Sequence, residues 1–185
     1  MIGQLRETVL SGLWEIEVAA RRDERGSLTR IFCADAFRQV RPDLQFVQAN
    51  LSETRLRGTV RGLHFQMELA AECKLIRCLR GAVLDVAVDL RAESATFGRW
   101  HAVELSAQNA RAIFIPEGFA HGFQSLSDDV QLLYHHTVAY SAKDEAGIRF
   151  DDPALDIEWP LPVTMISDRD RALPLLGALF AGMTR

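Results

Sequence analysis

Apolar and polar residues alternate along most of this chain, which is the pattern of half-buried β-strands. Ala82–Leu90 shows it most clearly, because Leu84, Val86, Val88 and Leu90 fall on one face while Asp85 and Asp89 fall on the other. The pattern predicts strands at residues 14–18, 28–33, 46–52, 60–66, 74–79, 82–90, 100–105, 112–115, 119–126 and 130–140. Strands at this hairpin-like spacing favour an antiparallel sandwich or barrel.

Helical periodicity is scarce and is confined to short segments near the two ends. Asp35 is predicted to cap a short helix that carries Phe37 and Val40 and ends before Pro42. Leu173–Met183 predicts a closing helix. The chain contains no linker-like segment and no internal repeat, so a single domain over residues 1–185 is expected.

Composition narrows the possible partners and the compartment. A formal net charge of −4 gives no electrostatic reason to expect a nucleic acid or an anionic membrane as partner. The three cysteines form no CxxC pair and are expected to be buried thiols in a reducing compartment. Neither a signal peptide nor a membrane-spanning run is recognisable, so the cytoplasm is the expected location.

The stretch Arg61-Gly62-Leu63-His64-Phe65-Gln66 is the strongest candidate for the wall of a site. In a strand, Gly62, His64 and Gln66 face one way and Leu63 and Phe65 the other. A small and polar face backed by an apolar face suits a cavity wall. Strict alternation puts Arg61 on the face opposite His64. The alternative interpretation makes His64 a hydrogen-bonded structural histidine.

A second motif, Pro116-Glu117-Gly118-Phe119-Ala120-His121, matches the PxGxxH turn of the cupin double-stranded β-helix. Metal-binding cupins pair this histidine with an HxH motif, but here Gln66 stands where the second histidine of that motif would be. Transition metals generally need at least three good protein ligands, and no spacing argues for Glu72 or Asp85 as a third. No metal or other cofactor is therefore predicted.

Four polar residues together supply the parts needed to remove a proton next to a ketone. His64 is a base near neutral pH, Asp170 can orient an imidazole, Lys74 can stabilise an enolate oxygen, and Tyr134 can return a proton from the other face. Three of them also have a structural alternative. Lys74 could be a surface lysine, Tyr134 a core residue, and Asp168 or Asp170 the N-cap of a short terminal turn.

Many short motifs in the same order make the chain resemble the dTDP-4-dehydrorhamnose 3,5-epimerases of the cupin superfamily. The resemblance extends from about Trp14 to Pro174. Besides the two motifs above, it includes Asp23-Glu24-Arg25-Gly26, Gln48-Ala49-Asn50, Lys74-Leu75-Ile76-Arg77-Cys78, Thr96-Phe97-Gly98-Arg99-Trp100, Tyr134, Tyr140, Asp151-Asp152-Pro153, Trp159-Pro160 and Ser167-Asp168-Arg169-Asp170. It implies an all-β, cupin-type jelly roll with short helices near the N- and C-termini.

The resemblance also implies roles for individual residues. His64 would remove the protons at C5 and then C3 of a nucleotide-linked 4-keto-6-deoxyhexose, with Asp170 as its partner, Lys74 beside the C4 oxygen and Tyr134 as the acid. The implied substrate-binding residues are Arg25, Gln48, Asn50, Arg61, His121 and Tyr140. Arg61 would meet the diphosphate, and Arg25 would reach it from the second subunit of a homodimer with exchanged N-terminal strands.

The nucleotide end departs from the family pattern, because Leu28 and Arg30 stand where an aromatic and an acidic residue are usual. The identity of the nucleotide therefore stays open. Alternatives to a 3,5-epimerase are an epimerase acting at one carbon or on another nucleotide sugar, a 3,4-ketoisomerase and, less favoured, a non-catalytic binding cupin. A metal oxygenase is disfavoured by Gln66.

Overall fold

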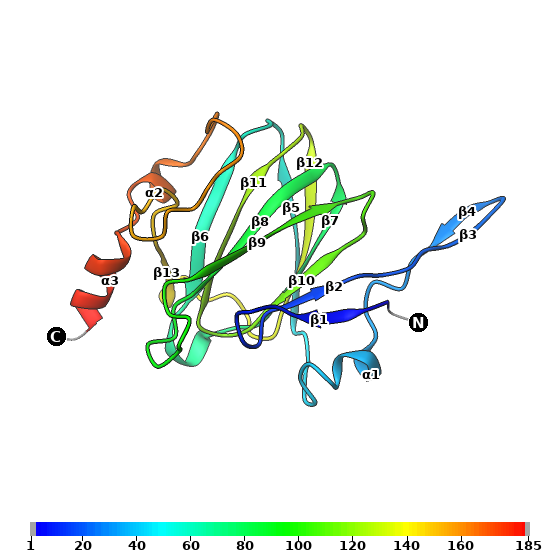
Figure 1. Ribbon diagram of the computed structural model, residues 1–185, viewed down its shortest axis with the longest axis horizontal. Helices are drawn as coiled ribbons and strands as arrows, with labels where there is room; N and C mark the ends of the chain where they lie inside the picture. Colours follow the sequence, from blue (N-terminus) through cyan, green and yellow to red (C-terminus); the bar gives the residue numbers. More distant parts are fainter. Residues whose placement is uncertain (1–2, 184–185) are drawn as a thin grey trace.

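The computed structural model describes residues 3–183 and places most of the strands in two facing antiparallel sheets (Figure 1). The six-stranded sheet has the order β1 (Leu5–Glu7), β2 (Trp14–Ile16), β10 (Ala112–Ile115), β7 (Lys74–Arg80), β12 (Val130–His136) and β5 (Gln48–Thr54). The five-stranded sheet has the order β13 (Glu145–Gly147), β6 (Val60–Gln66), β11 (Phe119–Ser125), β8 (Ala82–Asp89) and β9 (Trp100–Ser106). This arrangement confirms the predicted antiparallel sandwich.

The main core fills one end of the space between the sheets. The inward-facing side chains of β7, β10 and β12 meet those of β8, β9 and β11, and Ile76, Leu105, Ile113, Phe123 and Leu132 are nearly inaccessible to solvent. Burial of each large apolar side chain contributes about 1.5–3 kcal/mol. This packed end fixes the distance between the sheets, so the other end keeps a stable opening.

The outer faces of both sheets are covered by segments near the chain ends. Leu63, Val86 and Ala120 on the five-stranded sheet pack against Ile148 and Leu155, which precede α2 (Asp168–Arg171) and α3 (Leu176–Met183). On the six-stranded sheet, a second cluster packs under α1 (Ala34–Phe37) and includes Phe37, Leu75 and Phe114. A 3₁₀ turn at Glu68–Ala70 links β6 to β7.

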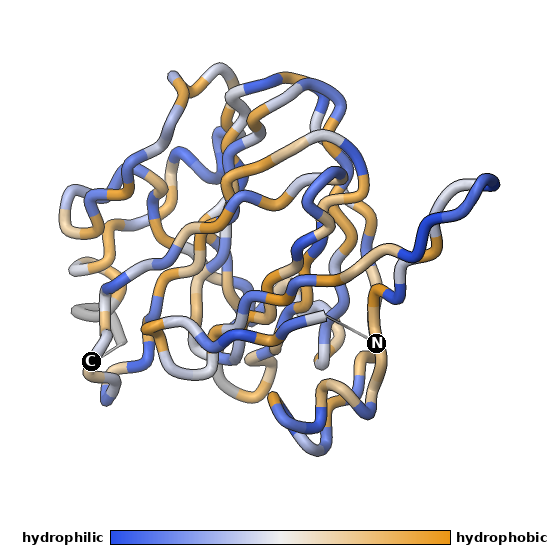
Figure 2. Tube along the Cα trace, turned by 45° about the vertical axis from the view of Figure 1, so that its right-hand side comes forward, coloured by the Kyte–Doolittle hydropathy of each residue, from blue (hydrophilic) through white to orange (hydrophobic). Residues whose placement is uncertain are grey.

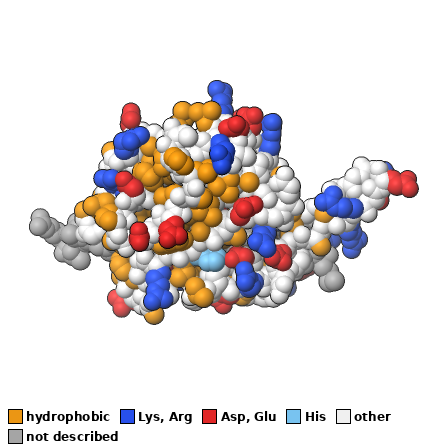
Figure 3. Space-filling model, turned by 45° about the horizontal axis from the view of Figure 1, so that its top comes forward, with side chains coloured by type: hydrophobic (Ala, Val, Ile, Leu, Met, Phe, Trp, Pro, Cys, Tyr) orange, Lys and Arg blue, Asp and Glu red, His pale blue; other side chains and the backbone are white. Residues whose placement is uncertain are grey.

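A two-stranded hairpin, β3 (Arg21–Asp23) with β4 (Gly26–Leu28), projects from the body of the molecule (Figure 1). Its tip is hydrophilic in Figure 2, and Figure 3 shows charged side chains along it. All of its residues are solvent-exposed in this chain, Leu28 to 74%. A hairpin of this length without an apolar face is at best marginally stable by itself.

Several predicted boundaries were wrong. The strand expected at residues 28–33 ends at Leu28, because the following residues leave the hairpin and lead to α1. Asp35 lies in the first turn of α1 rather than at its cap, which is Cys33 and makes no side-chain cap hydrogen bond. The strand expected at residues 130–140 ends at His136, and the closing helix starts at Leu176 rather than Leu173 because Pro174 lies just before it. Within the described residues, no helix is long and apolar enough to cross a membrane.

Candidate active site

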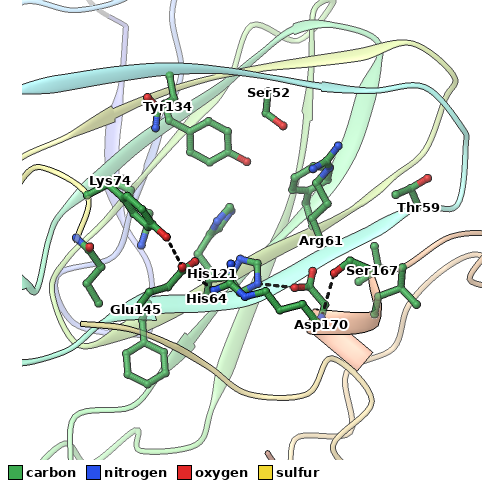
Figure 4. A pocket seen from close by; sticks show the side chains of 18 of the residues that line it. Ser52, Thr59, Arg61, His64, Lys74, His121, Tyr134, Glu145, Ser167 and Asp170 are labelled. Carbon is green, nitrogen blue, oxygen red and sulfur yellow. Dashed lines mark hydrogen bonds and ion pairs between the residues drawn. The ribbon is translucent and has the colours of Figure 1, made fainter. Parts of the chain in front are cut away.

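A cavity of about 690 Å³ opens between the two sheets at the end opposite the core. Its walls come from β5, β6, β7, β11 and β12 and from the segment that leads into α2 (Figure 4). The cavity lining includes the polar residues Asn50, Arg61, His64, Gln66, Glu72, Lys74, His121, Tyr134, His136, Tyr140, Glu145, Arg169 and Asp170.

His64 and Asp170 form a hydrogen-bonded pair on one wall of the cavity. His64 Nε2 lies 2.8 Å from Asp170 Oδ1, and Asp170 Oδ2 accepts a hydrogen bond of 3.0 Å from the Gly62 amide. Burial of Asp170 favours its neutral form, but the hydrogen bonds from His64 and Gly62 outweigh burial and lower the pKa of this carboxyl. Asp170 is therefore an anion that accepts the Nε2 proton, and His64 Nδ1 keeps a lone pair for chemistry.

The loop before α2 brings Asp170 to β6. Met165 forms a bridge with Thr59, and the Ser167 hydroxyl caps α2 by accepting a hydrogen bond of 3.0 Å from the Asp170 amide. Gly58 allows this close approach, since a Cβ on it would lie 2.8 Å from the carbonyl oxygen of Pro162. The predicted alternative in which Asp168 or Asp170 is the cap is wrong, because Ser167 is the cap.

Arg61 lines the same cavity as His64, contrary to the prediction from strict alternation. His64 pairs with His121, and Arg61 pairs with Phe123. The first pair is separated from the second by three residues along β6 but by only two along β11, so β6 carries one extra residue. This bulge shifts the side-chain parity by one residue. It needs Gly62, whose φ is +117° and whose Cβ would lie 2.6 Å from the Cα of Gly122. The Arg61 guanidinium is held by Thr54 Oγ1 at 3.0 Å and the Glu53 carbonyl at 2.9 Å.

Lys74 and Tyr134 extend from the facing sheet, on β7 and β12 (Figure 4). The Lys74 ammonium lies 2.8 Å from Glu72 Oε1, and only 10% of its side chain is exposed. Burial of the Tyr134 ring, reinforced by the charge of Asp85, raises the pKa of the phenol well above its usual value. Tyr134 therefore holds its proton at neutral pH and is a donor. The predicted alternative of a surface lysine is wrong.

His121 lies in the cavity wall beneath Tyr134 and is held by a buried carboxylate. Its Nε2 lies 2.9 Å from Asp85 Oδ2, and its ring meets the Tyr134 ring edge to face with centroids 5.8 Å apart. Asp85 therefore holds the imidazole of His121 in place.

At the cavity mouth, Tyr140 donates a hydrogen bond of 2.6 Å to Glu145, which also forms an ion pair of 2.6 Å with Arg169. Sequence reasoning missed Glu145, Arg169 and His136. In the sequence, Glu145 and Arg169 look like ordinary surface charges. The position of His136 in the cavity depends on how β12 pairs with its neighbouring strands. Tyr140 and Asn50 line the cavity as predicted.

Two predicted substrate-binding residues lie away from the cavity. Gln48 does not line it but braces two residues that do, through hydrogen bonds to Asn50 (3.3 Å) and to the Tyr140 amide (3.0 Å). Arg25 lies at the tip of the projecting hairpin, 89% exposed and paired with Asp23. In one chain alone, therefore, Arg25 does not meet His64.

The donor set at the predicted cupin metal position does not fit a metal site. Gln66, in place of a histidine, donates hydrogen bonds to Glu72 Oε2 (2.8 Å) and to the Ala70 carbonyl (3.1 Å), and it accepts one from the Ser141 amide (2.6 Å). Its amide is thus fully engaged in the wall. Among residues 3–183, no three His, Cys, Asp or Glu side chains converge as a metal-ion site.

The arrangement can perform acid–base chemistry on a group placed in the cavity. A base with an orienting carboxylate lies on β6, while an acid and a buried cation lie on the opposite sheet. A carbon acid bound between them can lose a proton to one face and gain one on the other. The ammonium can meanwhile stabilise the negative charge that develops on a carbonyl oxygen.

Comparison with known proteins gives relatives over almost the whole chain. A dTDP-4-dehydrorhamnose 3,5-epimerase of Sinorhizobium fredii is 45% identical over 155 residues, covering 83% of this chain and 80% of the relative. A dTDP-4-dehydrorhamnose 3-epimerase of Streptomyces niveus is 40% identical and covers 97% and 87%. The crystal structure of the epimerase RmlC from Legionella pneumophila in complex with dTDP-4-keto-L-rhamnose superposes with a TM-score of 0.91 at 39% identity, covering 97% and 96%.

A jelly roll whose cavity joins a His–Asp pair to a facing tyrosine and lysine has the arrangement that suits a cupin-type isomerase. The family model for dTDP-4-dehydrorhamnose 3,5-epimerase matches residues 7–178. This chain belongs to that family. The predicted family, jelly-roll fold and isomerase class are therefore confirmed.

Proposed function

We propose that this protein epimerises C3 and C5 of dTDP-4-keto-6-deoxyglucose to give dTDP-4-keto-L-rhamnose. The observation that carries the proposal is the placement of the His64–Asp170 pair and of Tyr134 on opposite walls of one cavity, with Lys74 on the same sheet as Tyr134 (Figure 4). Inversion at a carbon requires proton removal from one face and return to the other, and this placement supplies both.

In the first half of each inversion, His64 Nδ1 takes the proton from the carbon next to the C4 ketone. The electron pair of the C–H bond moves to the C4 oxygen, and Lys74 stabilises the resulting enolate. Asp170 stabilises the imidazolium at 2.8 Å. An oriented cation at an enolate oxygen contributes on the order of 3 kcal/mol to the barrier.

In the second half, Tyr134 delivers its phenolic proton to the opposite face of the same carbon. The enolate collapses to the ketone with inverted configuration, and both side chains exchange protons with solvent before the next step. The raised pKa of Tyr134 keeps the donor loaded at neutral pH. The ketone of the substrate is the electron sink, so the proposed reaction uses no metal or other cofactor.

The remaining cavity residues bind the nucleotide-linked sugar. Arg61 is the fixed cation for the diphosphate, and it suits a phosphate because its guanidinium is planar and already oriented. Asn50, His121 and Tyr140 line the sugar region.

The projecting hairpin supports a homodimer with exchanged N-terminal strands. In such a dimer, Arg25 reaches the diphosphate in the cavity of the second subunit, with Leu28 and Arg30 near the nucleotide. Sedimentation tests the assembly, and Arg25→Ala should raise KM without dissociating the dimer. The three free thiols fit a protein of the cytoplasm.

The experiment that tests the proposed function is proton NMR of dTDP-4-keto-6-deoxyglucose with the enzyme in D₂O. Entry of deuterium at both C3 and C5, with formation of the L-rhamno product, is the expected result. Absence of exchange at either carbon would refute the proposal.

A second candidate is epimerisation at a single carbon. It is favoured by the Streptomyces niveus relative, which is named a 3-epimerase and matches 97% of this chain. The same spectrum decides between the two, because a single-site enzyme leaves C5 fully protonated while C3 takes up deuterium.

A further inference from the structure

A second histidine, His136, is buried in the cavity wall, and the reaction proposed above does not use it. It ends β12 two residues after Tyr134, on the same face of the strand, and is only 8% exposed. A buried polar side chain is costly unless its polar atoms find partners, so its contacts are informative.

The contacts of His136 lead to the group that anchors Lys74. His136 Nδ1 lies 3.3 Å from Glu72 Oε2, and the other oxygen of Glu72 lies 2.8 Å from the Lys74 ammonium. Gln66 donates a hydrogen bond of 2.8 Å to the Oε2 atom that His136 approaches. Burial opposes ionisation of Glu72, but His136 and Lys74 outweigh it and lower the pKa of the carboxyl. One anionic carboxylate therefore links Lys74, Gln66 and His136.

The orientation of the His136 ring is set from its other side. Its Nε2 lies 3.5 Å from Asn50 Nδ2, which has only hydrogens to offer, so Nε2 is the acceptor and Nδ1 carries the proton. Nδ1 faces Glu72 Oε2 at ion-pair distance, although the angle of this contact is not that of a hydrogen bond. The ring is also parallel to the Tyr134 ring within 10°, with centroids 6.0 Å apart. His136 thus contacts both the anchor of the cation and the acid.

We propose that Glu72 and His136 form a positioning pair that fixes the Lys74 ammonium and the Tyr134 ring relative to each other. The inference rests on the proposed function, in which Lys74 and Tyr134 act on the same substrate carbon and its ketone. A lysine has a flexible stem and a compact charge, so its ammonium keeps one place only if a counter-ion is itself held. Misplacing a reacting group by about 1 Å costs up to about 100-fold in rate.

Two variants remove the pair in different ways. His136→Phe keeps a ring against Tyr134 but has no proton for Glu72, and Glu72→Gln keeps the shape of the carboxylate but not its charge. Each should lower kcat by roughly 10- to 100-fold with KM changed less than about threefold, because Lys74 acts on the enolate rather than on the bound ketone. His136→Asn, whose amide can donate to Glu72, should recover part of the lost kcat.

His135→Phe is the matched control. This neighbour lies on the other face of β12, where its ring packs against Phe46 at 5.4 Å between centroids, and it does not line the cavity. The control should keep wild-type kcat. Glu72→Gln provides the test if His136→Phe fails to fold.

The decisive comparison uses a second background. In Lys74→Met, adding His136→Phe should lower the residual exchange rate less than about twofold, because the pair then has no cation to position. Wild-type kcat in both His136→Phe and Glu72→Gln, or an equal loss with and without Lys74, would overturn the inference. Wild-type enzyme that exchanges neither C3 nor C5 would instead refute the proposed function itself.

Discussion

Replacing Asp170 by asparagine tests how much of the proposed catalysis depends on the partner of His64. The substitution preserves the shape of the side chain, and the asparagine oxygen can still accept the hydrogen bond that the Gly62 amide now donates at 3.0 Å. What it removes is the negative charge 2.8 Å from His64 Nε2. It also places an NH₂ group against that nitrogen, which moves the ring proton to Nδ1 and blocks the base.

The size of the effect follows from the geometry. Two unit charges 2.8 Å apart attract by about 6 kcal/mol at an effective dielectric constant of about 20. The side chain of His64 is 32% exposed, and water screens roughly half of this attraction. In the variant, the imidazolium that forms during proton removal thus loses about 3 kcal/mol of stabilisation. Together with the shift of the ring proton to Nδ1, this loss predicts a fall in kcat of about 100- to 1000-fold.

The assay is the initial rate of deuterium entry at C3 and C5 at saturating substrate, with KM expected to change little. Asp151→Asn is the control, since Asp151 is a surface carboxylate paired with Arg149 at 2.7 Å. A variant Asp170→Asn that keeps more than about a third of wild-type kcat would refute the reasoning that the carboxylate stabilises the imidazolium.

Three further outcomes are expected. Burial of Asp89 opposes ionisation, but hydrogen bonds from Arg91, Ser94 and Thr96 lower its pKa to about 2. The ionised carboxylate therefore stabilises the folded protein fully above pH ~4, and this contribution is lost as pH falls toward 2. Asp89→Asn should lower the free energy of unfolding, measured with urea, by about 2 kcal/mol at pH 7 and leave it unchanged near pH 2. Arg61→Ala should raise KM roughly 10- to 100-fold with kcat nearly unchanged, whereas a fall in kcat alone would argue against a role in binding the diphosphate. Leu28→Phe combined with Arg30→Glu should tighten dTDP binding about threefold by calorimetry, and unchanged affinity would mean that these residues do not touch the nucleotide.

Most of the sheet framework could be predicted from the sequence because alternation is a local property of each strand. Alternation along Val130–His136 puts Tyr134 and His136 on one face and His135 on the other, and in the structure His135 packs on Phe46 outside the cavity that the other two line. The hairpin at residues 21–28 was harder to predict, because all of its residues are exposed and its pattern carries no apolar face.

The site was predictable where its residues lie on regular strands. It was less predictable where a local irregularity determines which way a side chain faces. Alternation put Arg61 opposite His64, but a bulge that requires Gly62 brings both into one cavity. The pairing of Asp85 with His121 and of Glu72 with Lys74 depends on contacts between strands, which spacing along the chain does not reveal.

The central claim is that His64 and Tyr134 act on opposite faces of the sugar, and Tyr134→Phe in D₂O tests it most directly. Without the phenol, His64 can still remove a proton and return a deuteron to the same face. The account predicts deuterated substrate of unchanged configuration, with inversion slowed about 100-fold or more. Inversion at the wild-type rate, or loss of exchange together with inversion, would contradict it.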